Sequence, residues 1–560
     1  MLRCPDMKMI KIFIVILAFS IILPFSSYAM IDMLSLSGDA DLDGKVNLID
    51  VSQILKYIAK WDVDIAGSNS DVNGDGKINV GDVSKILKFI AKWDVDMPCG
   101  EEGLSSADGM YTWDLTPYED STVLLDNPDK GLYIHYLDNG LNRYGVKDGE
   151  YLMPEDLPSG LPIDHIYIRI AWCHLEPEEG KFNWSLIDDI MEPWTAAGVK
   201  VAFRITCKET DTNQYYATPK WVKDAGAAGK ELGNAWEPEW NDPVFLEKLR
   251  NFHMAFAERY DSNENVIYVD IGSLGDWGEG HTTFGSGEYY TYDTLLLHMD
   301  IYTEAYKNTL IVMNDDILTH EGIGGRYRNE LLEYVEEHGF SLRDDSIATK
   351  WHYDQYEYED YGKTSVKIPT LFVRYSDDVP MVLELDHYGN TVSENNDTWQ
   401  DGKTLLNAIK QTHATYAGFH YYPVDWYNDS NEEISRELVN TLGYWYFPKL
   451  FSFAEKDGGM EYRITLANNG AAQSYKDYGM VLTLVNGESK VVLEAKDFES
   501  SSILSGDTGS AEFSGDMPES GEWTAYIRMT DDDGREIKLA MDPERYNSDI
   551  GYNVGTIKIN

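Results

Sequence analysis

The chain has 560 residues, of which 43% are hydrophobic and 13% aromatic, so it is long enough for several folded domains with cores of enzyme size. Its 96 acidic and 46 basic residues give a formal net charge of −50 at pH 7. A chain this acidic should repel nucleic acid and anionic membrane surfaces, which argues against nucleic-acid binding and suits a secreted protein acting on a neutral substrate, although most of the charge is also explained by solubility alone.

Residues 1–29 predict a secretory signal peptide. Arg3, Lys8 and Lys11 form a basic start, and an almost wholly apolar run covers residues 12–23. That run is shorter than the roughly 20 residues that a membrane-spanning helix needs. Small residues before position 30 place cleavage after Ala29, with an uncleaved anchor as the alternative. The sequence therefore predicts an extracellular protein with no membrane partner after signal cleavage.

Two near copies of one acidic unit follow, "GDADLDGKVNLIDVSQILKYIAKWDVD" at residues 38–64 and "SDVNGDGKINVGDVSKILKFIAKWDVD" at residues 70–96. Calcium needs six or more oxygen ligands on a short curved loop, with glycine at loop position 6 and a backbone carbonyl at position 7. Loop positions 1, 3, 5, 7, 9 and 12 are Asp39, Asp41, Asp43, Lys45, Asn47 and Asp50 in one copy and Asp71, Asn73, Asp75, Lys77, Asn79 and Asp82 in the other. An apolar stripe at helical spacing follows each loop. The alternative, an acidic turn that binds nothing, fits one copy better than two.

Position 12 is Asp in both loops, and each helix follows its loop with no clear helix before it. In these features residues 36–97 resemble a type I dockerin. The resemblance implies two Ca²⁺ ions and a partner, the cohesin module of a scaffold protein in cellulosome-type complexes that degrade plant walls. It also implies that Leu48-Ile49 and Val80-Gly81 help to select the cohesin. Residues 98–110 form a linker.

From residue 111 to residue 449 short apolar runs alternate with helical stretches, which predicts a (β/α)₈ TIM barrel of α/β class. An open doubly wound sheet is the alternative, but no Gly-rich dinucleotide fingerprint supports it. The eight strand candidates are residues 131–136, 165–172, 200–206, 266–272, 310–314, 347–352, 381–385 and 417–422.

In such a barrel the chemistry lies at the carboxyl ends of the strands. Glu279 follows the fourth candidate strand and Glu384 lies near the end of the seventh. Strands four and seven face each other across the mouth, so the separation of about 5–5.5 Å used by retaining glycosidases is within reach. Asp386 points to the same side as Glu384 and competes with it for the nucleophile role. In a chain with 96 acidic residues, either glutamate is alternatively a loop acid or a structural partner.

Five further residues are candidates for binding a sugar. Trp277, Trp351 and Trp426 offer flat faces for stacking, and Arg169 and His352 offer donors for hydroxyl groups. The alternatives are that the tryptophans pack in the core, that Arg169 is a structural ion-pair partner, and that His352 is a buried barrel histidine.

The stretch "WCHLEPEEGKFNW", from Trp172 to Trp184, resembles the second-strand signature of β-galactosidase-like members of the large clan of retaining barrel glycosidases. By strand order, this resemblance implies that Glu279 is the acid/base and Glu384 the nucleophile. Many clan members carry Asn directly before the acid/base, whereas this chain has Gly278. The segment "GDWGE", and the arrangement of residues 115–560, also resemble a secreted bacterial family of unknown function.

Residues 450–560 alternate apolar and polar side chains and break at turn-forming Asn-Gly and Asp-Gly pairs. This pattern predicts a C-terminal all-β, immunoglobulin-like sandwich. Its role is either carbohydrate binding or simply covering the barrel.

Cys99, Cys173 and Cys207 remain after signal cleavage, and an odd count is not a disulfide framework. Cys173 and Cys207 each follow a predicted strand, so they are expected to be buried thiols with one optional bridge.

The sequence as a whole predicts a secreted, docked glycoside hydrolase that acts on a plant-wall polysaccharide or a derived oligosaccharide by a retaining mechanism. The rival is a non-catalytic carbohydrate-binding or structural subunit docked by the same module. A secreted protease ranks last, because no His-Glu-x-x-His zinc site or nucleophile elbow is present.

Overall fold

The computed structural model describes residues 38, 40, 46–61, 63, 65, 70–72, 77–91, 104–107, 110–137, 141, 144–147, 150–209, 214–319, 328–347, 368–388, 402–420, 422–427 and 431–559. The chain divides into two compact units, residues 1–105 and residues 106–560. The predicted signal peptide lies outside the described residues and stays a prediction.

The first unit contains two helices of 11 residues, α1 (Leu48–Ile58) and α3 (Val80–Ile90). Asn47 and Asn79 cap their amino ends, and the carboxylates of Asp50 and Asp82 accept hydrogen bonds from the backbone N–H groups of these two caps. The core of this unit consists of Ala40, Val51, Ile54, Val72, Val83 and Ile86. The predicted helix after each loop is confirmed.

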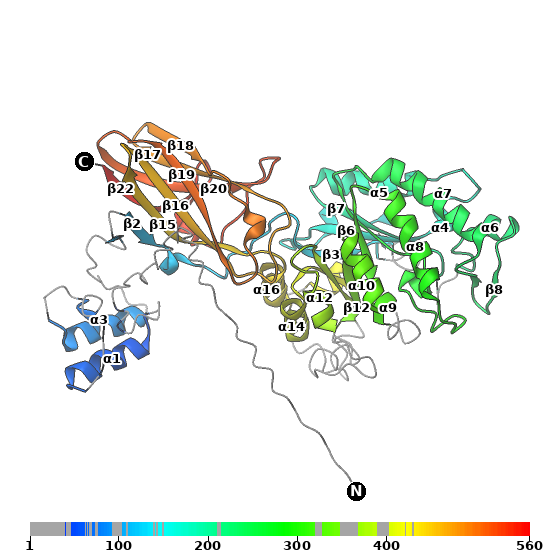
Figure 1. The fold of residues 1–560 in the computed structure, drawn as a ribbon, viewed down its shortest axis with the longest axis horizontal. Coiled ribbons are helices and arrows are strands. Elements are labelled where there is room, and N and C mark those ends of the chain that lie inside the picture. Colours follow the sequence, from blue (N-terminus) through cyan, green and yellow to red (C-terminus); the bar gives the residue numbers. More distant parts are fainter. Residues whose placement is uncertain are drawn as a thin grey trace, which may run out of the picture. The chain divides into compact units, whose positions relative to one another are not determined.

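The second unit contains a closed barrel of eight parallel strands, so the fold class predicted for this region is confirmed (Figure 1). Their order in the chain is also their order around the barrel, and the last strand pairs with the first. The strands are β3 (Gly131–His135), β6 (His165–Ala171), β7 (Lys200–Thr206), β10 (Val266–Asp270), β11 (Leu310–Asn314), β12 (Ser341–Ile347), β13 (Met381–His387) and β14 (Ala414–His420).

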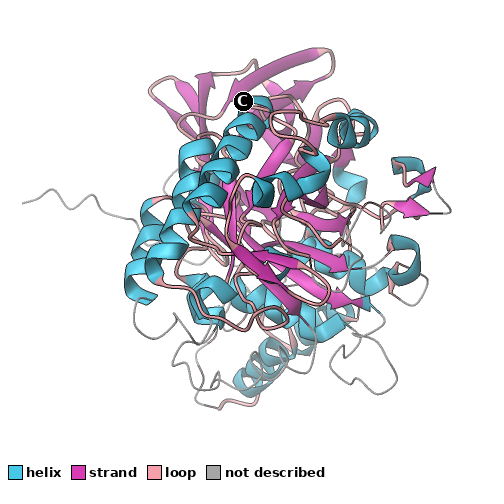
Figure 2. Cartoon of the chain, turned by 90° about the vertical axis from the view of Figure 1, so that its right-hand side faces the viewer, coloured by secondary structure: helices cyan, strands magenta, loops and turns pink. Residues whose placement is uncertain are grey.

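Helices cover the outside of the barrel (Figure 2). They are α4 (Trp172–Leu175), α5 (Ser185–Ala196), α6 (Lys220–Asp224), α7 (Pro243–Tyr260), α8 (Tyr292–Ala305), α9 (Asp316–Thr319), α10 (Arg328–Glu337), α12 (Ile368–Val373), α14 (Lys403–Thr412), α15 (Pro423–Trp426) and α16 (Glu432–Thr441). The longer ones are amphipathic: α5, for example, buries Ile187, Ile190 and Trp194. Within the described residues, no helix combines the length and apolarity needed to cross a bilayer.

The barrel connections also carry two small hairpins, β4 (Val146–Lys147) with β5 (Glu150–Tyr151) and β8 (Gly229–Glu231) with β9 (Trp236–Pro238). Short 3₁₀ turns occur at Thr116–Tyr118, Pro154–Asp156, Asp276–Gly278, Ser500–Ser502 and Pro543–Arg545.

The barrel interior is built in layers. An apolar layer consists of Tyr133, Tyr167, Ala202, Tyr268, Val312, Val382 and Tyr416. Side chains two residues apart on a strand point to the same face, so the next layer toward the carboxyl ends also faces the interior. We call it the polar layer; it consists of His135, Arg169, Arg204, Asp270, Asn314, Arg343 and Glu384, all of them buried.

The C-terminal part forms two antiparallel sheets of five strands, which confirms the predicted all-β region (Figure 1). In strand order, one contains β1 (Leu104–Ala107), β2 (Met110–Asp114), β15 (Tyr446–Lys456), β16 (Gly459–Asn468) and β19 (Thr508–Asp516). The other contains β18 (Ser489–Glu494), β17 (Gly479–Asn486), β20 (Gly521–Thr530), β22 (Gly551–Ile559) and β21 (Tyr546–Asn547).

Two features differ from the sequence-based prediction. The sixth barrel strand spans Ser341–Ile347, not residues 347–352 as predicted. The prediction was wrong because this strand carries charged side chains and does not resemble an apolar run. Residues 111–114, assigned to the barrel domain, and Met110, assigned to the linker, pair with β15 instead and belong to the sandwich. Pairing between segments more than 300 residues apart leaves no local signal in the chain.

The sandwich contacts the amino-terminal end of the barrel. Asp129, just before β3, receives hydrogen bonds from Lys200 of the barrel (2.5 Å) and Lys476 of the sandwich (3.1 Å). The carbonyl of Ser376, before β13, accepts from Gln473 (3.0 Å) and Tyr475 (2.6 Å). These contacts lie at the end of the barrel away from the polar layer, which favours a covering role for the sandwich.

Candidate active site

The loop after β10 carries Glu279 in a strained backbone. Trp277 has a φ of 52° and Gly278 a φ of 79°, and such strain in a bulky residue is typical of functional sites. A Cβ atom at position 278 would lie 2.5 Å from the Cα of Gly272. No side chain fits there, so the glycine found where the clan resemblance leads one to expect asparagine is required by the close approach of two backbone segments.

Glu279 is buried among cationic groups. Its Oε1 accepts a hydrogen bond from Arg204 Nη2 at 3.2 Å and lies 4.0 Å from Arg169 Nη1, and its Oε2 lies 3.6 Å from His281 Nε2. Burial opposes ionisation, but the hydrogen bond with His281 and the charge of Arg204 outweigh it and hold the pKa of Glu279 below its usual value.

His281 lies between two carboxylates. Its Nδ1 is 3.4 Å from Asp276 Oδ2, on the side opposite Glu279. Burial lowers the pKa of His281, but hydrogen bonds with Asp276 and Glu279 outweigh burial and raise it. Lys208 also donates to Asp276, which fixes the loop. Glu279 and His281 therefore form a buried ion pair.

Glu384, on β13, has a different set of partners. Arg343 Nη1 donates to its Oε2 at 2.9 Å, His420 Nδ1 lies 3.3 Å from its Oε1, and His135 Nε2 lies 3.7 Å from its Oε2. Burial opposes ionisation, but the charge of Arg343, together with His135, lowers the pKa of Glu384. It is therefore a carboxylate at neutral pH. The competing Asp386 is partly exposed and accepts from the backbone and ring of His387.

One ion network connects the two glutamates. Asp270 accepts from Arg343 Nε at 2.7 Å and lies 3.8 Å from Arg204 Nη1. The network thus runs from Glu279 through Arg204, Asp270 and Arg343 to Glu384. Both glutamates therefore lie at the same end of the closed barrel, and each is negatively charged beside an arginine.

Three imidazole rings stack beside Glu384. The His135 and His420 rings are 4.0 Å apart at 18°, and the His420 and His387 rings are 4.5 Å apart at 17°. The ligand atoms of His135, Glu384 and His420 lie within 4.8 Å of one another, a spacing that suggests a metal site. However, each imidazole lone pair lies in its ring plane, and nearly parallel stacked rings cannot both aim at one ion at about 2.0–2.1 Å. The arrangement does not fit a metal.

Five residues around the two glutamates were not predicted from the sequence: Arg204, Asp270, His281, Arg343 and Asp345. Asp345 is partly buried on β12, and burial, together with the nearby charge of Glu279, raises its pKa well above the usual value. The alternation of "SLRDDSI" at residues 341–347 would have placed Arg343 and Asp345 on one face of a strand.

The structure separates the other predicted sugar contacts. Arg169 lies beside Glu279, as described. Trp277 is partly exposed, with its ring centre 5.3 Å from that of Phe284, which is 61% exposed. Trp426 is only 1% exposed and stacks on Phe419 at 3.9 Å, which favours its packing role over a sugar platform. Trp351 and His352 lie outside the described residues.

Six of the predicted calcium ligands are described: Asn47, Asp50, Asp71, Lys77, Asn79 and Asp82. The carboxylates of Asp50 and Asp82 are fully buried at the amino ends of α1 and α3. Buried carboxylates need compensating positive charge, so they fit a calcium ion bound by these loops. Asp39, Asp41, Asp43, Lys45, Asn73 and Asp75 lie outside the described residues.

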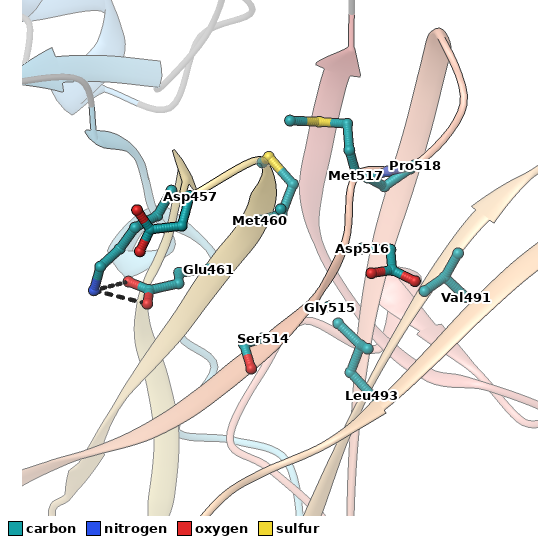
Figure 3. A pocket seen from close by; sticks show the side chains of 12 residues that line it. Asp457, Met460, Glu461, Val491, Leu493, Ser514, Gly515, Asp516, Met517 and Pro518 are labelled. Atoms are coloured by element: carbon teal, nitrogen blue, oxygen red, sulfur yellow. Dashed lines mark hydrogen bonds and ion pairs between the residues drawn. The ribbon is translucent and has the colours of Figure 1, made fainter.

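A cleft of about 690 Å³ opens between the sandwich sheets near β16, β18 and β19 (Figure 3). Asp457, Met460 and Glu461 line one side, and Val491 and Leu493 line the other. Lys456 pairs with Glu461 at 2.8 Å. The cleft contains no aromatic ring on which a sugar could stack, so it does not support the carbohydrate-binding alternative for the sandwich.

Cys173 is partly buried and Cys207 is buried, and both are free thiols in the structure. Burial raises the pKa of Cys173 to about 12, so this thiol is unreactive at neutral pH. Cys99 lies outside the described residues.

Profiles of known protein families match two regions of the chain. The dockerin type I domain profile matches residues 37–91, and the β-galactosidase profile matches residues 163–273, which include Arg169, Arg204 and Asp270 but end before Glu279. The β-galactosidase BglY of Alicyclobacillus acidocaldarius is 29% identical over 101 residues, which is 17% of this chain. The match spans only 14% of the length of that relative.

Several solved structures align with this chain at low TM-scores. Endo-glycoceramidase II from Rhodococcus sp. has a TM-score of 0.35 and 14% identity over 72% of this chain and 99% of its own. A β-galactosidase from Halorubrum lacusprofundi has a TM-score of 0.35 and 13% identity over 56% of this chain and 58% of its own. An endo-1,4-β-xylanase from Caldicellulosiruptor owensensis has a TM-score of 0.32 and 12% identity over 52% of this chain and 85% of its own.

Proposed function

We propose that this chain, which carries a dockerin type I domain and a β-galactosidase family region, is a retaining glycoside hydrolase that docks onto a scaffold protein. The observation that carries the proposal is the ion network of the barrel. It supports two buried carboxylates at one end of a closed ring, one after the fourth strand and one on the seventh.

In the proposed reaction Glu384 attacks the anomeric carbon while the departing glycosidic oxygen takes a proton from Glu279. The carbon–oxygen bond breaks and a covalent glycosyl-enzyme forms. Glu279 then accepts a proton from water, whose oxygen displaces Glu384 and releases the sugar. Arg343 suits this role of Glu384, because it holds the attacking group as an anion in a buried site.

Glu279 is ionised in the resting site, so it needs a source for the proton that it donates. His281 supplies this proton. Positioned at 3.6 Å and oriented by Asp276, it keeps a proton on the pair at neutral pH. As the departing oxygen gains negative charge, the proton passes from His281 to Glu279 and on to that oxygen.

The docking part of the proposal rests on the first unit. Dockerin type I domains bind calcium, and we assign one ion to each loop, two in total. Leu48, Ile49 and Val80 are 63%, 55% and 65% exposed. A groove of about 470 Å³ on α3 is lined by Val83, Leu87 and four other residues. Exposed apolar side chains of this kind support docking to a cohesin in an extracellular, cellulosome-type complex.

The substrate class follows from charge and context. A chain with a net charge of −50 suits a neutral glycan, and a docked enzyme acts where plant-wall polysaccharide is degraded. The matched relative is a β-galactosidase, so galactosides within plant-wall polysaccharide or derived oligosaccharides are the first substrates to test.

The test uses the full chain with calcium and measures sugars released from plant-wall polysaccharides and nitrophenyl glycosides. We expect Glu279→Gln and Glu384→Gln to abolish turnover of natural glycans while the melting temperature stays close to that of the wild type. Asp386→Asn is the matched control and should retain activity. A wild type that binds glycans but releases no sugar would replace this proposal with the rival, a non-catalytic docked subunit.

A further inference from the structure

The last residue of β11, Asn314, carries a donor that the described part of the chain leaves without an acceptor. Its side chain is fully buried. The side-chain oxygen accepts a hydrogen bond from the backbone N–H of Asp316 at 2.8 Å, which fixes the orientation of the amide. The amide nitrogen Nδ2 has no hydrogen-bond partner among the described residues.

Asn314 faces the interior of the barrel at the level of the proposed catalytic residues. Val312, two residues earlier, belongs to the apolar layer of the interior, so Asn314 points to the same side one layer closer to the carboxyl ends. It also pairs in register with Arg343, the residue that binds Glu384. The unused donor therefore belongs to the polar layer.

The loop carrying Glu279 lies against the turn that follows Asn314. A Cβ atom on Gly280 would lie 2.3 Å from Cγ1 of Ile317, the third residue after Asn314. On the other side of Glu279, position 278 has no room for a side chain. The loop therefore offers no side-chain donor directly before Glu279, whereas Asn314, at the end of the neighbouring strand, carries an unused one.

A buried donor without an acceptor costs about 1–3 kcal/mol, and nearly all buried polar groups in proteins are paired. A ligand that supplies an acceptor would remove this cost. The sugar whose bond is cleaved would place its 2-hydroxyl next to the anomeric carbon, between Glu279 and Glu384. Hydrogen bonds to that hydroxyl strengthen in the transition state of glycosidases.

We propose that Asn314 is a substrate-positioning residue whose Nδ2 donates a hydrogen bond to the 2-hydroxyl of the cleaved sugar. This inference rests on the proposed function. It adds a specificity: the site takes sugars that carry a free 2-hydroxyl and discriminates against those that lack one.

The test compares Asn314→Ser with the wild type on a nitrophenyl glycoside and on its 2-deoxy analogue. Serine keeps an oxygen that can accept from Asp316 but removes the amide donor. We expect kcat/KM on the glycoside to fall about 10–100-fold, with no further loss on the 2-deoxy analogue. Calorimetric binding of an iminosugar with and without its 2-hydroxyl gives a second readout that needs no turnover, and we expect the same pattern.

Asn440→Ser is the matched control. Asn440 is also buried, but its Nδ2 already donates to the carbonyls of Ser121 and Val123, at 3.2 and 2.8 Å. We expect this variant to lose stability and to treat both sugars as the wild type does. Equal losses on both sugars in Asn314→Ser would overturn this inference but not the proposed function. A protein that neither cleaves nor binds any of these sugars would overturn the proposed function as well.

Discussion

Replacing His281 with glutamine tests the shared proton. His281 Nε2 lies 3.6 Å from Glu279 Oε2. Two opposite unit charges at that distance attract by about 4–5 kcal/mol at an effective dielectric constant of about 20, which corresponds to about three pKa units. In the wild type the pair keeps its proton until the pH passes the raised pKa of His281. In His281→Gln the proton must stay on Glu279 alone, which loses it at a much lower pH.

The assay is kcat/KM against pH on a glycoside that the wild type hydrolyses. We expect the basic limb to move toward acid in His281→Gln by at least the about three pH units that correspond to the attraction of the pair. His253→Gln is the control, because this buried histidine on α7 contacts Tyr306 and not Glu279. A basic limb that stays in place in His281→Gln would refute the shared proton and point to another donor.

Three further outcomes are expected. Removing calcium with a chelator should unfold α1 and α3, because the buried carboxylates of Asp50 and Asp82 then lose the positive charge that compensates them. The unfolding is measured as lost helical signal in circular dichroism, and an unchanged spectrum would count against the calcium loops. Burial lowers the pKa of Lys130 to about 7, so the folded state holds fewer protons than the unfolded one between about pH 7 and 10 and becomes more stable as pH rises there; Lys130→Met should flatten that rise in a melting-temperature series, and an equal slope in both proteins would contradict it. The raised pKa of Asp345 gives a contribution to stability that is present below about pH 4 and is lost as the pH rises toward that raised pKa. Asp345→Asn should therefore gain in melting temperature relative to the wild type across that range, and a constant difference would show that Asp345 does not titrate as described.

Patterns that repeat within a short stretch of chain were read correctly from the sequence. The dockerin type I match over residues 37–91 agrees with the two acidic repeats, whose spacing follows the ligand positions of a 12-residue calcium loop. Seven of the eight barrel strands were located because a parallel strand buried on both faces is a continuous apolar run. Once the strands were counted, their order alone placed Glu279 and Glu384 at one end of the barrel.

The sixth strand was not located correctly from the sequence. Its residues Arg343 and Asp345 are charged because they lie at the level of the polar layer, so no apolar run marks β12 and it was predicted several residues too late. For the same reason Arg343, which connects Glu384 to Asp270, was not predicted as a site residue.

Sequence alone therefore determined the dockerin region, the barrel and the position of the two candidate glutamates in the strand order. Only the tertiary structure showed that Arg204 and Arg343 contact those glutamates, that His281 lies 3.6 Å from Glu279, that Gly278 is forced by the backbone of Gly272, and that Trp426 is buried. The physical reason is distance along the chain. Hydrogen bonds inside the barrel join residues 41 to 250 positions apart in the chain. The charge, burial and space around each side chain therefore depend on neighbours that no local pattern specifies.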